Sequence, residues 1–158
     1  MTKPLWTPSK TEATSTNMWT FLKTVERQYG VSLATYADLW RWSVERPEAF
    51  WLSLWEFIGI IGETRGDVAL EAADNMIGAR FFPNAHLNFA ENLLQRRDAG
   101  TACLLWREDG LRRRVTWAEL YESVSRVRQL FDDLGVQRGD RVAAYLPNIP
   151  EALVFMLA

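Results

Sequence analysis

The chain has 158 residues, enough for one domain or slightly more, and it can bury about two thirds of the surface of its unfolded form. It is 48% hydrophobic and 24% charged with a net charge of −2, which excludes a strongly basic protein that binds nucleic acid or anionic membranes. The single cysteine excludes an intrachain disulfide and a cysteine-based metal cluster. Because the sequence also lacks a signal-peptide core and an apolar run near membrane-spanning length, we expect a cytoplasmic protein.

Apolar side chains at helical spacing predict three consecutive helices in the first part of the chain. The first begins at Asn17 and stops at Gly30, the second begins at a capping pair of Thr35 and Asp38, and the third begins at Pro47. The residues expected on the apolar faces of the second and third helices are Tyr36, Leu39, Trp40 and Val44, and Phe50, Trp51, Leu54, Trp55 and Ile58. Aromatic packing should therefore dominate this part.

Residues 62–85 contain several glycines and a proline, which interrupt helices and strands, so we expect this segment to be irregular. A short helix, Phe89–Arg97, follows, with Asn88 and Glu91 as its capping pair. We expect the chain to divide near residue 98, because strand-like patterns begin only after it.

The sequence pattern of the second part predicts the first elements of an α/β sheet. Two strand-like runs flank Asp109-Gly110, a strong hairpin signal, and a helix then begins at the capping box of Thr116 and Glu119. The nearly apolar run Arg141–Leu146 is typical of a buried parallel strand, and it completes a βαβ unit. Asn148 and Glu151 are expected to cap the next helix. One βαβ unit is not a sheet, so we expect an N-terminal piece of a longer protein.

Two stretches of the second part, "RGDRVAAYLPNIPEALVFMLA" and "DGLRRRVTWAELYESVSRVRQLFDDLGV", resemble the adenylate-forming superfamily of acyl-CoA synthetases, luciferases and peptide-synthetase adenylation domains. In the first part, "TYADLWRWSVERPEAFWLSLWEFIGI" and "FFPNAHLNFAENLL" resemble the N-terminal cap of short-chain acyl-CoA synthetases. The opening "PLWTPS" and the later "NMWTFLKTVERQYGV" are more similar to acetoacetate-activating members than to acetate- or propionate-activating ones.

The resemblance implies a helical N-terminal cap at residues 1–98 and the incomplete start of an AMP-binding large domain at residues 99–158. It implies a ligase that converts acetoacetate, ATP and CoA to acetoacetyl-CoA, AMP and diphosphate with Mg²⁺. The family's phosphate loop, ribose ligand, hinge and catalytic lysine would all follow Ala158. We therefore predict no catalytic, cofactor-binding or metal-binding residue in this chain, which should be inactive without the rest of the large domain and the C-terminal domain. An acetyl- or propionyl-CoA synthetase fragment and a non-catalytic interaction module are the alternatives.

Several side chains have both a functional and a structural interpretation, and the structural one is favoured for each. His86 has too few nearby ligands for a metal site, and Cys103 lies in an apolar predicted strand. The tripeptide Arg65-Gly66-Asp67 matches an adhesion motif, which we interpret as chance. Residues 148–151 should cap a helix rather than bind a ligand.

The arginine cluster and the tryptophans are interpreted in the same way. Strand alternation should point Arg113 away from Arg112 and Arg114, so we expect a solvated hairpin edge with Arg107 rather than a phosphate or nucleic-acid patch. The helical spacing of the tryptophans, with no interleaved Lys or Arg, favours packing over ligand or base binding, and the resemblance implies that Trp51 and Trp55 are buried between cap helices or against the large domain.

Overall fold

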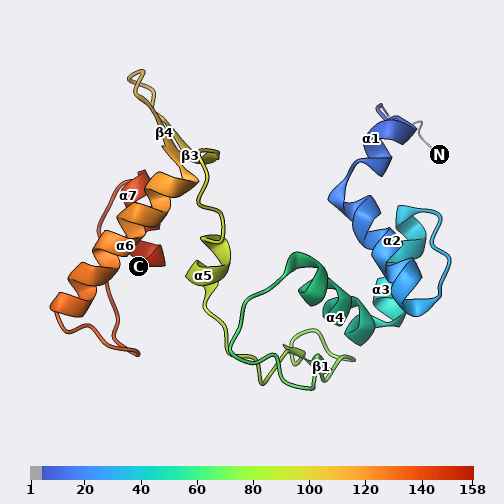
Figure 1. Ribbon diagram of the computed structural model, residues 1–158. Coiled ribbons are helices and arrows are strands. Elements are labelled where there is room, and N and C mark those ends of the chain that lie inside the picture. The colour runs from blue at the N-terminus through green and yellow to red at the C-terminus, as the bar shows by residue number, and fades with distance from the viewer. Residues whose placement is uncertain (1–4) are drawn as a thin grey trace. The chain divides into compact units, whose positions relative to one another are not determined.

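The computed structural model describes residues 5–158, which pack as two compact units (Figure 1). One unit ends at Leu87 and the other comprises Asn88–Ala158. This division rests on packing, whereas the division expected near residue 98 separates a cap from a large domain and stays a prediction.

Helices dominate the first unit, and they begin where the capping signals predict. They are α1 (Lys10–Thr14), α2 (Asn17–Tyr29), α3 (Tyr36–Glu45) and α4 (Pro47–Ile58). Gly30 takes the left-handed conformation, with φ of 64°, and so ends α2. Thr35 and Asp38 form the reciprocal capping box of α3, in which each side chain accepts a hydrogen bond from the other residue's backbone N–H.

The core of the first unit lies between α2, α3 and α4. Its buried side chains are Phe21, Leu22, Val25, Leu33, Leu39 and Trp42. The predicted apolar face of α3 is partly wrong, because Trp40 and Val44 are 57% and 61% exposed and Trp42 is buried instead. Leu39 and Trp42 are three residues apart on a helix and share one face, and that narrow face alone packs against the neighbouring helices.

Residues 62–85 are largely irregular, as predicted, but they include one short antiparallel ladder. It pairs β1 (Leu70–Glu71) with β2 (Arg80–Phe81). The segment packs on α4 through aromatic rings: the Trp51 ring centroid lies 5.0 Å from that of Phe81, and Trp55 lies 4.6 Å from Phe82. Both tryptophans are half-buried.

The second unit is built on the predicted hairpin. Its elements are α5 (Phe89–Leu93), β3 (Thr101–Trp106), β4 (Arg112–Thr116), α6 (Trp117–Asp133) and α7 (Pro150–Leu157). β3 and β4 pair antiparallel around a turn in which Gly110 has φ of 90°. The capping box of Thr116 and Glu119 begins α6, as predicted.

The helix after Asn88 is shorter than predicted. Asn88 Oδ1 accepts a hydrogen bond of 3.0 Å from the Glu91 backbone N–H, so the start is confirmed. The helix ends at Leu93 rather than at Arg97, and Leu94, its C-cap residue, is buried in the core of the second unit. The side chains buried there are Leu94, Val115, Leu120, Val124, Val154 and Leu157.

The structure contradicts two predictions at the end of the chain. Arg141–Leu146 forms no strand, and its side chains are exposed, because no other strand among the described residues pairs with it. Without that strand the βαβ unit is incomplete. The capping prediction for α7 is also wrong: Ile149 is the N-cap residue and makes no side-chain cap, and the Glu151 carboxylate pairs with Arg113 instead.

Candidate functional site

At the junction between the hairpin and α7, a charged pair lies near the chain's single cysteine, Cys103. Arg113 Nη1, from β4, donates a hydrogen bond to Glu151 Oε1 in the first turn of α7. This hydrogen bond and the positive charge hold the pKa of the Glu151 carboxyl below its ordinary value. The pair is therefore charged at neutral pH and fixes the start of α7 on the hairpin.

A cavity of about 370 Å³ lies beside this junction, between β3 and the start of α7. Its lining includes Cys103 to Arg107, Asn148 to Pro150, and Leu153. The Cys103 thiol is half-buried, and burial raises its pKa, so it stays protonated at neutral pH. Because the thiolate is the nucleophilic form, this cavity offers packing surface rather than an activated nucleophile.

A second groove, of about 520 Å³, runs between α5 and α6. Its floor includes the buried Leu94, Val124 and Leu157. At its rim the Arg97 guanidinium stacks 3.9 Å from the Tyr121 ring centroid. An apolar floor with a cationic, aromatic rim can bind a polypeptide segment, but it contains no paired acid and base for catalysis.

The arginine cluster is split by strand alternation, as predicted. Arg113 faces α7, whereas Arg112 lies over the Trp106 ring and Arg114 binds the chain near Thr101. Arg107 forms an ion pair of 2.7 Å with Asp109 in the turn.

The remaining candidates lie apart from this junction in sequence and have structural partners. His86 is exposed, and its backbone forms an isolated bridge with Thr64. Arg65, in the adhesion-like tripeptide, pairs with Glu56 at 3.6 Å. Within residues 5–158, no group of three or more His, Cys, Asp and Glu side chains is placed to hold a metal ion. No helix in this part of the chain is both long and apolar enough to cross a membrane.

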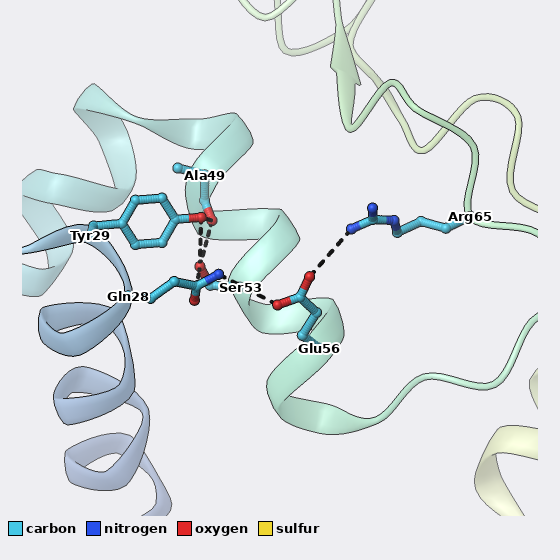
Figure 2. A network of polar contacts seen from close by, with 6 residues as sticks. All are labelled: Gln28, Tyr29, Ala49, Ser53, Glu56 and Arg65. Atoms are coloured by element: carbon cyan, nitrogen blue, oxygen red, sulfur yellow. Dashed lines mark hydrogen bonds and ion pairs between the residues drawn. The ribbon is translucent and has the colours of Figure 1, made fainter.

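A polar network in the first unit was not predicted from the sequence. Figure 2 shows it around Ser53, which is only 1% exposed and donates to the Ala49 carbonyl at 2.8 Å. Tyr29 donates to the same carbonyl, and Gln28 connects to Glu56. A serine within an apolar helical stripe is the one signal that could have revealed it. The network satisfies polar groups where α2 meets α4, so its role is structural.

Two family models match this chain, one in each part of it. The model of the acetyl-coenzyme A synthetase N-terminus matches residues 36–93, and the model of AMP-binding enzymes matches residues 91–158. Acetoacetyl-coenzyme A synthetase of Rhizobium meliloti is 43% identical over 156 residues, which are 99% of this chain and 24% of that protein. Malonamoyl-CoA synthetase of Penicillium aethiopicum is 41% identical over 151 residues, 91% of this chain and 21% of that protein.

A solved structure agrees with the sequence comparisons. Acetoacetyl-CoA synthetase from Streptomyces lividans matches with a TM-score of 0.84 and 35% identity, over 99% of this chain and 25% of that one. The chain thus spans about a quarter of the length of the relatives it matches.

Proposed function

Because the chain is homologous, over nearly its whole length, to the N-terminal part of acetoacetyl-CoA synthetases, we propose that it serves as the cap and the start of the large domain of an AMP-forming acetoacetate–CoA ligase. The observation that carries this proposal is the 43% identity over 156 residues. The proposed cap comprises residues 1–98, and the proposed beginning of the large domain comprises residues 99–158.

The reaction would have two steps. The carboxylate of acetoacetate attacks the α-phosphorus of ATP and releases diphosphate, and the CoA thiol then attacks the acyl carbon of the adenylate and releases AMP. Both steps need main-chain donors and cations around phosphate groups, and Mg²⁺ would offset their charge.

Within residues 5–158, no group of three or more His, Cys, Asp and Glu side chains is placed to hold Mg²⁺, and the resemblance implies that the ATP and CoA sites follow Ala158. We therefore place those sites in the remaining polypeptide, the partner that this chain would need, and assign the described residues a scaffolding role. We propose a cytoplasmic location and no nucleic-acid partner, in keeping with the net charge of −2.

The names of the two curated relatives narrow the substrate class. Acetoacetate and malonamate are both short carboxylates with a carbonyl group at the β carbon, and they differ only in a terminal methyl or amino group. We propose that the acid activated by the ligase belongs to this class, with acetoacetate first and malonamate second.

The test is ATP–diphosphate exchange by the protein as its source cells make it, after its mass has been determined with an antibody against residues 36–97. We expect a band several times larger than 18.2 kDa and exchange that is faster with acetoacetate than with acetate or propionate. Purified 1–158 should give no exchange. A native band at 18.2 kDa, or exchange by 1–158 alone, would overturn the proposal.

A further inference from the structure

The groove between α5 and α6 opens at the end of α7. Its volume is about 520 Å³, and its floor includes the buried Val124 and Leu157. A second cavity, of about 370 Å³, lies beside it along α6. Three residues line both cavities: Asn88, Arg128 and Ala158. The two cavities therefore meet at Ala158, and together we call them the α6 groove.

α7 reaches the α6 groove without a stop signal. The three longest helices end beside a glycine in the left-handed conformation: Gly30 after α2, Gly59 after α4 and Gly135 after α6. Among the described residues, α7 meets no such glycine, and Ala158 still donates to the Val154 carbonyl at 3.1 Å, as in a helix. The last four carbonyls of a helix lack intrahelical donors, which further helical residues would supply.

The face that α7 presents to α6 is already defined. Its buried residues, Pro150, Val154 and Leu157, are four and three residues apart and therefore share one side of the helix. Beside them, the Phe155 ring centroid lies 6.1 Å from that of Phe131 in α6. If the same spacing continues, the next apolar side chain comes about four residues after Leu157 and faces the α6 groove.

We propose that, in the longer protein, the residues directly after Ala158 continue α7 as a helix of about two more turns and fill the α6 groove. This inference rests on the proposed function, because it needs a chain that continues as the relatives do, and the present chain spans 24% of one of them. The groove is then an internal packing surface of the large domain rather than a ligand site.

Two observations favour this occupant over a separate molecule. Ala158 forms part of the wall of both cavities, so the residues that follow it are held beside the groove at a high effective concentration. The cations at the rim are already engaged, because Arg128 pairs with Asp132 at 3.0 Å and the Arg97 guanidinium lies 3.9 Å from the Tyr121 ring centroid. The groove thus offers an apolar floor rather than free cations for a phosphate group.

The test is photo-cross-linking in the whole protein, expressed from its complete gene, with p-benzoylphenylalanine in place of Arg128 on α6 or of Glu91 on α5. Both residues line the groove and are exposed in residues 5–158. We expect the main cross-link from each position to join the peptide that directly follows Ala158. Arg126 is also exposed, points away from Arg128 on α6 and lines neither cavity, so it is the matched control and should give at least tenfold less of this product.

Cross-links to another segment, to a second copy or to a different protein would overturn the proposal, and so would equal yields from positions 126 and 128. Hydrogen exchange of the unaltered whole protein tests the conformation: the amides of the first residues after Ala158 should be protected consecutively, as in a helix, and rapid exchange there would contradict the proposal. This measurement remains decisive if a cross-linking variant does not fold.

ATP–diphosphate exchange by the same protein separates this inference from the proposed function. Exchange with acetoacetate but a cross-link elsewhere would overturn only the packing of the α6 groove. The expected cross-link without exchange would overturn only the ligase function, and a native chain of 18.2 kDa would overturn both.

Discussion

Arg113 of β4 donates a hydrogen bond to Glu151 in the first turn of α7, 38 residues further along the chain. The pair joins two elements that are separated by α6 and by the irregular segment before Pro150. Beneath it, the Val154 and Leu157 side chains of α7 are buried in the core of the second unit. The position of α7 thus depends on this ion pair and on apolar packing against α6 and β3.

A double-mutant cycle with R113Q and E151Q should reveal coupling between these two residues. Both side chains are about half-exposed, so we expect a coupling free energy of about 0.2–1 kcal/mol in urea unfolding. High salt should reduce the coupling, and so should acid, once the pH falls through the lowered pKa of Glu151. Additive effects of the two substitutions would show that the pair contributes nothing to stability.

Trp55 and Trp40 should respond differently to truncation. Trp55 packs its ring on Phe82 and is half-buried, so Trp55→Ala should lower the free energy of unfolding by about 2–3 kcal/mol, below the range for fully buried aromatics. Trp40 is exposed, and Trp40→Ala should change stability by at most about 0.5 kcal/mol. Chemical unfolding of both variants measures the difference. A Trp40→Ala effect as large as that of Trp55→Ala would contradict the observed faces.

The sequence predicted local features well because their causes are local. The capping boxes at Thr35 and Thr116 need only two residues three positions apart, and the hairpin turn at Asp109-Gly110 needs only its own backbone preferences. The choice between Trp40 and Trp42 depended on which face meets other helices, which helical periodicity alone does not specify when a helix is apolar on several sides.

The prediction of a strand at Arg141–Leu146 was wrong because strand formation also depends on distant parts of the chain. Its composition suits a strand buried on both faces, but a strand forms only where neighbours accept its backbone hydrogen bonds. In the candidate site, too, only the local feature could be predicted. Strand alternation correctly placed Arg113 on the opposite face from Arg112 and Arg114. The contact of Arg113 with Glu151 joins distant parts of the chain, so no local pattern in the sequence indicates it.

Acid should destabilise the chain through its capping carboxylates. Hydrogen bonds donated by Thr35 and by Thr116 hold the pKa values of Asp38 and Glu119, respectively, below their ordinary values in the folded chain. A lowered folded pKa means that the stabilisation is complete above the unfolded pKa, near pH 4, and is lost as the pH falls through the folded pKa. Melting temperatures should therefore drop steadily below about pH 4.

The variant E119Q separates the contribution of one cap from the general effect of acid. It keeps a side chain that can accept the capping hydrogen bond but cannot titrate, so its melting temperature should depend less on pH than that of the original chain below pH 4. Glu108 is exposed in the hairpin turn and caps no helix, so E108Q is the matched control and should follow the original chain. Parallel curves for E119Q and the original chain would contradict the assigned role of Glu119.

Hydrogen exchange should identify Arg141–Leu146 as a strand that lacks its neighbours. In 1–158 these residues form no strand, and Tyr145 is fully exposed, so their amides should exchange at nearly the rate of an unfolded chain. In a protein that continues as the relatives do, adjacent strands would accept these hydrogen bonds, and the same amides should be protected strongly. The amides of β3 that pair with β4 serve as the internal control and should be protected in both proteins. Slow exchange of 141–146 in the short chain would mean that the segment already has a partner, whereas fast exchange in the long protein would mean that its apolar composition does not reflect burial in a sheet.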